Sequence, residues 1–365
     1  MTIRRVLITT DAVGGVWTYS VELAGALRAL GIEPVLAAMG PSPSLQHLAT
    51  AGRTPVIDTG LSLDWLADSA DEVRQAGLAI AQLSDDVGAD LVQLHSAALA
   101  CDALYKQPVV AVQHSCVATW WGAVLDEPLP QDLKWRRELV EWGLRRADAV
   151  VAPTQAFAAQ MARTYPLTRE VQTVHNGRTP LPMPERERAD LVLTLGRLWD
   201  AGKNVRTLDA AAQLTRVPYE AIGPLSGPDG SAVVFDHLVT RGSLDEAAIA
   251  ERLAACPVFV SSALYEPFGL SVLEAAQAGC ALVLSDIPTF RELWSDAAMF
   301  VPARVPQRFA DSIASLLNNP ELRDAYGRAA EQRAARYTPE ATARRMLEIY
   351  RNVAVDVSPE IARVG

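Results

Sequence analysis

Residues 257–286, PVFVSSALYEPFGLSVLEAAQAGCALVLSD, show the pattern of a strand, a loop, a helix and a second strand. The first run is short and apolar, as expected of a strand that is buried on both faces. Pro267 disfavours a helical conformation at Glu266, so these two residues belong to the loop. The helix is expected to begin near residues 269–271 and to end at Gly279, before the strand CALVLSD. Such a unit favours a parallel sheet with crossover helices.

The same alternation of short apolar runs and longer helical patterns continues along the chain. Strands that read as continuous Val, Ile, Leu and Ala are covered on both faces, and their alternation with helices indicates a doubly wound parallel sheet. The chain has 365 residues, half of them hydrophobic, which is enough for two cores of ordinary size. We therefore predict an α/β protein with two doubly wound, Rossmann-like domains. The other strand candidates are residues 4–10, 33–39, 89–95, 108–114, 147–154, 171–177, 190–198, 218–224 and 298–301.

A proline-rich stretch separates the two series of strands. Residues 178–188, RTPLPMPERER, carry prolines at alternate positions followed by charges, which is typical of a linker. Two helices in the second half are expected to start with capping boxes, Ser243 with Glu246 and Thr289 with Glu292. The predicted parts are an N-terminal domain at 1–178, the linker at 179–188, a C-terminal domain at 189–336, a last helix at 337–354 and a tail at 355–365.

Charge and composition exclude several classes of function. The net charge of -10 disfavours nonspecific nucleic-acid binding, although a local cation cluster can still bind a small anion. The four cysteines have no C-x-x-C spacing and the five histidines no H-E-x-x-H pattern, so we expect no metal site and no cofactor. The start of the chain reads as a strand, and no apolar run reaches membrane-spanning length. We expect a cytoplasmic protein, and peripheral contact with a membrane stays open.

Because ligands of doubly wound sheets bind at the carboxyl ends of the strands, the residues that follow each strand are the first candidates for a site. After the first strand, Gly14 and Gly15 lie where the chain turns into a helix, so their N–H groups can approach an anion. A tight turn alone explains them equally well. Trp17 and Tyr19, just inside that helix, either line the cleft between the domains or pack in the core.

Later strands of the first half end in polar residues. His95 and His114 each end a strand, and Asn176 follows the last one. A single histidine at such a place is usually structural, but polar ends gathered at one edge favour a shared ligand site. Asn176 with Gly177 is also a common turn pair. Trp120 belongs either to a packed loop or to the wall of an acceptor site.

In the second half, the strand at 190–198 is followed by two cations. Arg197 and Lys203 lie six residues apart across a glycine-containing loop, where a diphosphate would supply the matching charge. In the quoted stretch, Glu266 precedes the helix and Glu274 lies about one turn inside it. The N–H groups between the two acids form an anion site, so a sugar nucleotide fits this arrangement. A solvated surface acid does not explain Glu274, because LSVLEAAQA is otherwise small and apolar.

The E-x7-E element EPFGLSVLE, followed by AAQAGCALVLSD, resembles the retaining nucleotide-sugar glycosyltransferases of family 4, which have the GT-B fold. GRLWDAGKN, TVHNG and the early glycine pair occur in the order that this family shows. The resemblance covers about residues 5–353. It implies two Rossmann-like domains that face a cleft, with the acceptor on the N-terminal side, and a last helix that returns to the N-terminal domain.

The resemblance also implies roles for single residues. Glu274 would hold the ribose hydroxyls of the donor, Glu266 the hydroxyls of its sugar, and His114 would lie near that sugar. Arg197 and Lys203 would bind the diphosphate and stabilise it as it leaves. The catalytic set is then His114, Arg197, Lys203 and Glu266. The donor-binding set adds Gly14, Gly15, Pro267, Phe268, Gly269, Leu270, Ser271 and Glu274, and the acceptor-side candidates are Trp17, Tyr19, His95, Trp120 and Asn176.

The expected reaction is transfer of a hexosyl group from a nucleotide diphosphate sugar to a carbohydrate or other acceptor hydroxyl, with retention and without a metal ion. Glu266 is then not a nucleophile, unlike one of the paired carboxylates of retaining glycosidases. The alternatives are a GT-B-fold sugar-nucleotide epimerase and a noncatalytic sugar-nucleotide-binding protein. A phosphorylase that uses pyridoxal phosphate would need a Schiff-base lysine and a longer chain.

Overall fold

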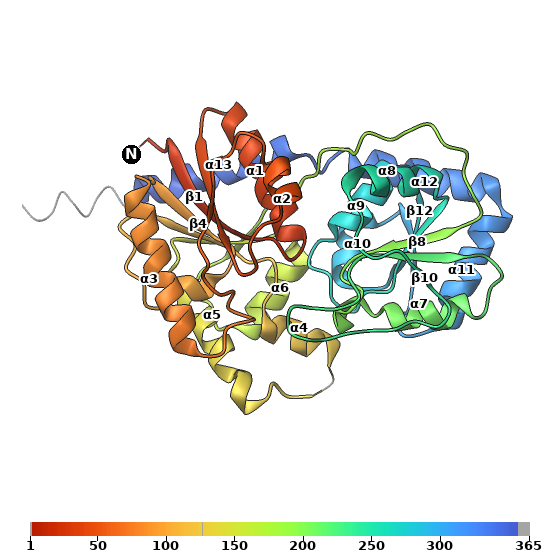
Figure 1. Ribbon diagram of the computed structural model, residues 1–365, viewed down its shortest axis with the longest axis horizontal. Coiled ribbons are helices and arrows are strands. Elements are labelled where there is room, and N and C mark those ends of the chain that lie inside the picture. The colour runs from red at the N-terminus through yellow and green to blue at the C-terminus, as the bar shows by residue number, and fades with distance from the viewer. Residues whose placement is uncertain (1, 126, 357–365) are drawn as a thin grey trace, which may run out of the picture. The chain divides into compact units, whose positions relative to one another are not determined.

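The computed structural model describes residues 2–125 and 127–356. The chain forms two compact units (Figure 1). The first unit comprises Met1–Gly177 and Thr338–Gly365, and the second unit comprises Arg178–Tyr337. Each unit contains one parallel sheet with helices around it. The prediction of two doubly wound α/β domains is therefore confirmed.

The first unit has a seven-stranded sheet in the order β3-β2-β1-β4-β5-β6-β7, and every neighbouring pair is parallel. The sequence pattern missed only β3, which is three residues long. The strands are β1 (Arg5–Asp11), β2 (Glu33–Met39), β3 (Val56–Asp58), β4 (Leu91–Leu94), β5 (Val109–Val112), β6 (Ala149–Ala152) and β7 (Val171–Thr173). The helices are α1 (Gly15–Ala29), α2 (Leu45–Ala51), α3 (Ala70–Asp86), α4 (Val117–Val124), α5 (Lys134–Arg146), α6 (Gln155–Thr164) and α13 (Pro339–Asp356), with 3-10 turns η1 (Ala97–Ala100) and η2 (Gln131–Leu133).

The last helix, α13, is part of the core of the first unit. It packs against α1, and its buried Met346 and Tyr350 join Tyr19 and Leu23 of α1 in one apolar cluster. The two elements are neighbours in Figure 1 although more than 300 residues separate them. The core of the first unit is therefore complete only when the end of the chain is in place.

The second unit repeats the topology with six strands in the order β10-β9-β8-β11-β12-β13, again with parallel pairs throughout. The strands are β8 (Val192–Leu195), β9 (Tyr219–Ile222), β10 (Val239–Thr240), β11 (Val258–Ser261), β12 (Ala281–Ser285) and β13 (Ala298–Val301). The helices are α7 (Val205–Ala212), α8 (Glu246–Ala255), α9 (Leu270–Gln277), α10 (Pro288–Trp294), α11 (Pro306–Asn318) and α12 (Pro320–Ala334), with a 3-10 turn η3 (Ala201–Lys203).

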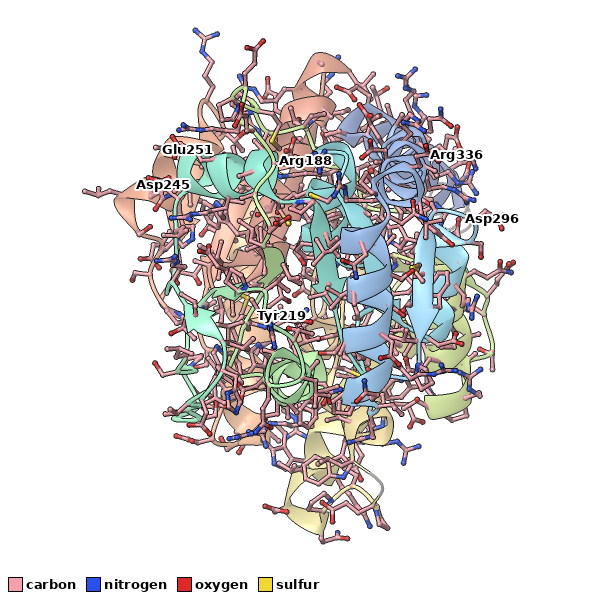
Figure 2. The ribbon with its side chains drawn as sticks, turned by 90° about the vertical axis from the view of Figure 1, so that its right-hand side faces the viewer. Arg188, Tyr219, Asp245, Glu251, Asp296 and Arg336 are labelled. Carbon is pink, nitrogen blue, oxygen red and sulfur yellow. The ribbon has the colours of Figure 1, made fainter. Side chains whose placement is uncertain are left out.

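Both predicted capping boxes are wrong. Helix α8 is capped by Asp245, whose carboxylate accepts from the N–H of Ala248 at 2.8 Å, and Asp245 lies at the start of the helix in Figure 2. Ser243 stands two residues too early for this role. Helix α10 begins at Pro288. Proline suits the first helical position because a backbone N–H there would have no partner within the helix, so its absence costs no hydrogen bond. Thr289 is therefore inside the helix and buried.

The proline-rich stretch at 178–188 forms no helix or strand, but it is packed on the second unit. Leu181 is buried in that unit's core, next to Leu191 and Phe268. Arg188 donates to the carbonyl oxygen of Cys256 at 2.7 Å. The stretch is therefore anchored in the second unit by Leu181, while residues 185–188 are exposed.

The chain order reverses at one place in each sheet. In the first unit this switch point lies between β1 and β4, and in the second between β8 and β11. Ligands of open α/β sheets bind beyond the carboxyl ends of the strands at such a point. The loops after β1, β4, β8 and β11 are therefore the first places to look for a site, and they carry most of the sequence candidates.

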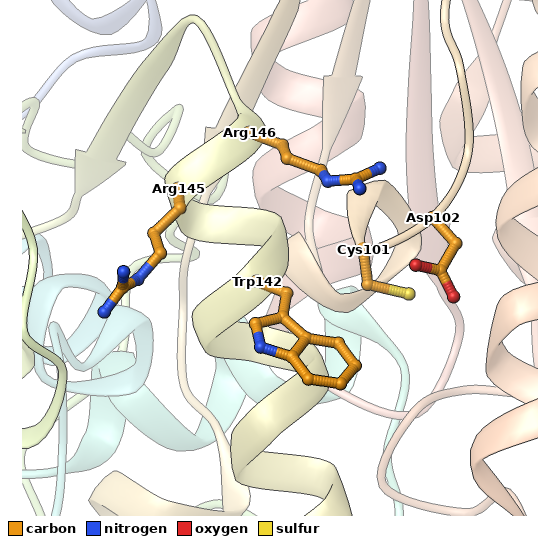
Figure 3. A pocket seen from close by; sticks show the side chains of 5 residues that line it. All are labelled: Cys101, Asp102, Trp142, Arg145 and Arg146. Carbon is orange, nitrogen blue, oxygen red and sulfur yellow. The ribbon is translucent and has the colours of Figure 1, made fainter.

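A pocket of about 340 Å³ lies elsewhere on the first unit, between η1 and the end of α5 (Figure 3). Two of its charged lining residues are paired, Asp102 with Arg74 at 2.7 Å and Arg145 with Glu141 at 2.9 Å. Arg145 and Arg146 come just before β6, so they stand at the amino end of that strand. The pocket is therefore at the edge opposite to the strand ends of interest. Its lining consists of Cys101, Asp102, Trp142, Arg145 and Arg146.

No helix among residues 2–125 and 127–356 is long and apolar enough to cross a membrane.

Candidate functional site

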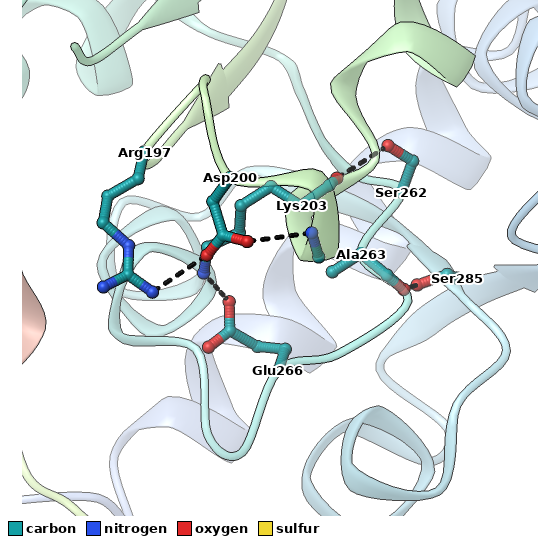
Figure 4. A network of polar contacts seen from close by, with 8 residues as sticks. Arg197, Asp200, Lys203, Ser262, Ala263, Glu266 and Ser285 are labelled. Carbon is teal, nitrogen blue, oxygen red and sulfur yellow. Dashed lines mark hydrogen bonds and ion pairs between the residues drawn. The ribbon is translucent and has the colours of Figure 1, made fainter. Parts of the chain in front are cut away.

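The switch point of the second unit brings together three of the predicted residues, Arg197, Lys203 and Glu266 (Figure 4). Arg197 follows β8 and donates to Asp200 at 2.9 Å. Lys203 ends the turn η3 and donates from Nζ to the carboxylate of Glu266, which comes from the loop after β11. The two cations and the first acid of the E-x7-E element therefore lie at one sheet edge.

The loop after β8 is held by its own hydrogen bonds. Asn204 adopts a left-handed conformation with φ 52° and donates from its side chain to the carbonyl oxygens of Ser262 and Ala303, at 2.9 and 2.7 Å. The hydroxyl of Ser262 donates in turn to the carbonyl oxygens of Lys203 and Asn204. These contacts tie the loop after β8 to the loop after β11, so Lys203 meets Glu266 in a fixed geometry.

Helix α9 begins at Leu270 directly after Gly269, whose φ of 92° favours glycine. A Cβ atom at this position would lie 3.2 Å from Glu266 Cγ and 3.3 Å from the ring of Phe290. The backbone therefore turns tightly around Glu266 before the helix starts. The first N–H groups of α9 have no side-chain cap, which is the arrangement that attracts an anion.

The predicted donor-binding segment places its side chains in different surroundings. Phe268 is buried and meets Tyr337 edge to face at 5.8 Å between ring centroids, so it belongs to the core. Pro267, Leu270 and Ser271 are half-buried at the surface. A ligand at this turn would therefore contact backbone groups and not the ring of Phe268.

Glu274 makes a contact that the sequence pattern did not reveal. Its Oε1 accepts from Nε of Arg178 at 2.9 Å, and the two side chains are 13% and 9% exposed. A second guanidinium nitrogen of Arg178 donates to Glu246 at 2.5 Å. The residues lie 96 and 68 positions from Arg178, and no local spacing indicates such pairs. Arg178 is the functional candidate that sequence reasoning missed, because its position suggested a linker.

The carboxyl edge of the first unit has a different chemistry. Helix α1 begins at Gly15 after Gly14, and Gly15 is exposed at its N-terminus. Asp11, at the end of β1, accepts from the N–H of Val13 at 2.9 Å and so shapes the turn. The glycine pair therefore does lie at a switch point, with backbone N–H groups at the surface.

Three rings meet beside this turn. The ring centroids are 4.5 Å apart for Tyr19 and His114, 4.8 Å for His95 and His114, and 5.3 Å for Tyr19 and His95. All three pairs are edge to face. Burial lowers the pKa of His114 to about 4, and burial together with the neighbouring His114 lowers the pKa of His95. Both imidazoles are therefore neutral at pH 7.

A directed chain of hydrogen bonds fixes the tautomer of His95. The hydroxyl of Tyr350, in α13, donates to Oε1 of Gln93, and Nε2 of Gln93 donates to Nε2 of His95 at 2.7 Å. The proton of His95 must then be on Nδ1, which lies 3.4 Å from the hydroxyl of Ser20. That hydroxyl donates onward to the carbonyl oxygen of Val16 at 2.7 Å.

The remaining acceptor-side candidates separate into buried and half-buried residues. Trp17 is 4% exposed, and its indole N–H donates to the hydroxyl of Thr50. Tyr19 is 2% exposed. Both side chains therefore pack in the core, which was one of the two alternatives for them. Trp120 is half-buried on α4 and packs near Trp121. Asn176 is buried. Neither Trp17 nor Tyr19 presents a surface to an acceptor.

Three buried polar atoms at this edge have no hydrogen-bond partner among the described residues. They are Oγ1 of Thr10, at the end of β1, Nε2 of His114, after β5, and Oδ1 of Asn176, after β7. Buried polar groups are usually paired, so unpaired ones at strand ends mark candidate ligand contacts. Two of the three, His114 and Asn176, were already candidates from the sequence.

The side chains that the structure describes include no group of three or more His, Cys, Asp or Glu residues arranged to hold a metal ion. The cations at the second-unit edge come from the protein itself. Metal independence of the reaction stays a prediction.

Comparison with known proteins adds an independent observation. The family model described as Glycosyltransferase Family 4 matches residues 13–180, and the one described as Glycosyl transferases group 1 matches residues 234–333. A D-inositol 3-phosphate glycosyltransferase of Frankia alni is 26% identical, with 94% of this chain and 95% of the relative covered. A phosphatidyl-myo-inositol mannosyltransferase of Mycobacterium leprae is 25% identical, with 95% and 96% covered.

Solved structures agree on the architecture. Sucrose-phosphate synthase from Thermosynechococcus elongatus matches with a TM-score of 0.78 and 18% identity, covering 97% of this chain and 100% of that one. HepE from Anabaena, in complex with UDP-glucose, matches with a TM-score of 0.74 and 17% identity, covering 95% and 99%. These similarities show that each unit is one of the two Rossmann-like domains of a GT-B fold.

Proposed function

The chain belongs to the family 4 glycosyltransferases, and we propose that this hexosyltransferase moves its sugar from a nucleotide diphosphate to an acceptor hydroxyl, with retention and without a metal ion. The observation that carries the proposal is the cluster of Arg197, Lys203 and Glu266 at the switch point, next to the uncapped start of α9. The complex of HepE with UDP-glucose supports a nucleotide-sugar donor for this fold.

The donor diphosphate is expected at the two cations of this cluster. Each is now paired with a carboxylate, Arg197 with Asp200 and Lys203 with Glu266. A diphosphate brings at least two negative charges and can accept charge-assisted hydrogen bonds from both cations and from the first N–H groups of α9. In the transition state the bond from the anomeric carbon to the phosphate oxygen lengthens, and negative charge grows on that oxygen. Arg197 and Lys203 stabilise this charge.

Retention follows if departure and attack occur on one face of the sugar. The bond from the anomeric carbon to the phosphate oxygen breaks, the bond to the acceptor oxygen forms, and the leaving phosphate takes the acceptor's proton. Glu266 is assigned to the hydroxyls of the donor sugar. Its hydrogen bond to Lys203 supports this role, because a carboxylate shared with a cation is a weaker nucleophile than a free one.

His114 is the first-unit residue assigned to the donor sugar. Its pKa of about 4 keeps the imidazole neutral, and its buried Nε2 has no partner within the described residues. A neutral ring can donate to or accept from a hydroxyl without adding charge near the developing oxocarbenium ion.

The proposed acceptor comes from the names of two related glycosyltransferases. The two relatives above are named for an inositol phosphate and a phosphatidylinositol, so we propose an inositol-type polyol, free or carried on a lipid, as the acceptor to try first.

The test is a donor screen with the complete chain. UDP-, GDP- and ADP-linked glucose, mannose and N-acetylglucosamine are incubated with and without inositol 3-phosphate or phosphatidylinositol vesicles. Release of nucleoside diphosphate is followed, and the anomeric configuration of the product is read by proton NMR. An α-linked product from an α-linked donor is expected. If a donor binds but no donor–acceptor pair releases nucleoside diphosphate, the protein is a noncatalytic sugar-nucleotide-binding protein. A product with inverted anomeric configuration would exclude retention.

A further inference from the structure

Arg178 occupies an unusual position for a cation. It is the first residue of the second unit, and only 9% of its side chain is exposed. Burying a guanidinium is costly unless it is paired and hydrogen-bonded. Here it is paired twice, through Nε with Glu274 at 2.9 Å and through a terminal nitrogen with Glu246 at 2.5 Å. The side chain thus bridges the first residue of α8 and the second turn of α9.

The backbone of Arg178 is fixed as well. Its N–H donates to the carbonyl oxygen of Tyr337 at 3.2 Å, and its carbonyl oxygen accepts from Nε2 of Gln277 at 2.7 Å. Gln277 lies three residues after Glu274, so Arg178 contacts one face of α9 at two successive points. The backbone contacts fix where the side chain begins, and the two carboxylates fix where the guanidinium ends.

The two acids that share this cation differ in their need for it. Glu246 is 49% exposed and can be hydrated, whereas Glu274 is 13% exposed and depends on protein partners. The two carboxylates share this guanidinium. Because the planar guanidinium fixes the orientation of a carboxylate, Glu274 is held in one rotamer while it keeps capacity to accept from hydroxyl groups.

We propose that Arg178 is a positioning residue that orients Glu274 toward the vicinal hydroxyls of the donor's ribose. This inference rests on the proposed function, in which Glu274 binds those hydroxyls. A carboxylate that is already ordered loses less side-chain entropy when the nucleotide binds, so the benefit of Arg178 should appear in nucleotide affinity. It should depend on the ribose hydroxyls being present.

The experiment measures calorimetric dissociation constants of UDP, GDP and their 2′,3′-dideoxy analogues for the complete protein. The variants are Arg178→Met and Arg178→Lys, and Glu246→Gln serves as the matched control because it removes the other partner of the same guanidinium. Arg178→Met is expected to weaken the preferred ribonucleotide about tenfold and to leave the dideoxy analogue within twofold. Arg178→Lys should recover part of the loss, and Glu246→Gln should bind as the wild type does.

Equal loss for the ribose and dideoxy nucleotides in Arg178→Met would overturn the inference, because a merely structural role of the arginine weakens both. An unchanged affinity for both would overturn it too. Wild-type protein that binds neither nucleotide would instead overturn the proposed function, and the inference with it. Melting temperatures identify a variant that fails to fold, in which case Arg178→Lys alone is compared with the wild type on the same two nucleotides.

Discussion

The two carboxyl edges of this protein have the same topology and different electrostatics. In the second unit, three cations and their acids lie at or beside the strand ends, with Lys203 on Glu266 and Arg178 on Glu274. In the first unit the corresponding edge holds the carboxylate of Asp11 and two histidines that burial keeps neutral and that pack with Tyr19. These histidines form the neutral edge of the molecule. The same fold thus presents two chemically different edges, and the difference lies in a few residues after each strand.

This contrast suggests a division of tasks. A charged edge suits a diphosphate, which needs cations that are in place before it arrives. A neutral edge suits sugar and polyol hydroxyls, which hydrogen-bond without carrying charge. Changing one residue or one condition at a time therefore tests the contrast.

The largest effect is expected from removing a cation at the charged edge. Lys203→Met should lower kcat/KM for the donor by about 1,000-fold, or about 4 kcal/mol, because it takes away transition-state stabilisation and leaves Glu266 unpaired. Steady-state release of nucleoside diphosphate measures it. Lys106→Met removes an exposed lysine that pairs with Asp85 and should change the rate by less than twofold. A similar loss in both variants would refute a specific role for Lys203.

The neutral edge is tested by pH. His114 has a pKa of about 4 in the folded protein, below the value of about 6.5 in the unfolded chain, so the unfolded state binds the extra proton first as pH falls. The stability from keeping His114 neutral is full above pH 6.5 and is lost between pH 6.5 and 4, by about 3 kcal/mol.

Urea unfolding of wild type and His114→Gln at pH 7, 6, 5 and 4 measures this term. The free energy of unfolding of the variant should fall less steeply as pH falls. The difference between the two proteins cancels the titrating groups that do not touch His114, and it includes the change at His95, whose pKa His114 also lowers. Identical slopes would show that the pKa of His114 is the same in the folded and unfolded states, which would contradict the prediction.

Substitutions of the two acids of the E-x7-E element should change different parameters, the nucleotide affinity for Glu274 and kcat for Glu266. Glu274→Gln is expected to weaken UDP or GDP binding roughly 10- to 30-fold, as loss of hydrogen bonds to a charged group does. Glu266→Gln should lower kcat and leave the dissociation constant of the nucleotide nearly unchanged, because Glu266 is assigned to the transferred sugar. Calorimetry with the nucleoside diphosphate and steady-state kinetics with the donor distinguish them. Unchanged nucleotide affinity in Glu274→Gln would contradict the assignment.

The smallest effect is expected from metal removal. Because Arg197 and Lys203 are the charges assigned to the diphosphate, 5 mM EDTA should change the transfer rate by less than twofold. The assay compares dialysed protein with and without added Mg²⁺ or Mn²⁺. Activity that is lost in EDTA and restored by either ion would show that the charged edge is incomplete without a metal.

Much of this organisation could be predicted from the sequence. Continuous apolar strands, helix ends at glycine and the E-x7-E element are local patterns, so they indicated the sheets, the switch-point loops and the pair of acids. The two capping boxes failed for local reasons as well. Asp245 lies directly before the first helical residue where Ser243 does not, and Pro288 starts α10 earlier than Thr289 would.

Pairings between distant residues could not be predicted. Arg178 stands in a proline-rich stretch that reads as a linker, and its partners lie 68 and 96 residues away. The burial of Trp17 and Tyr19 depends on packing from α2 and α13, which a pattern within α1 does not show. Lys203 contacts Glu266 because β8 and β11 are neighbours in the sheet. A local sequence pattern does not show the order of the strands in a sheet.

The position of α13 has a consequence for the order of folding during synthesis. The second unit has all its residues once Tyr337 has been added, whereas the first unit lacks Met346 and Tyr350 until the last helix has left the ribosome. At roughly 5–20 residues per second, the first 177 residues wait on the order of ten seconds or more for that helix. During this time the face of α1 that α13 will cover is open to solvent. The unit that is made first is thus the unit whose core is completed last.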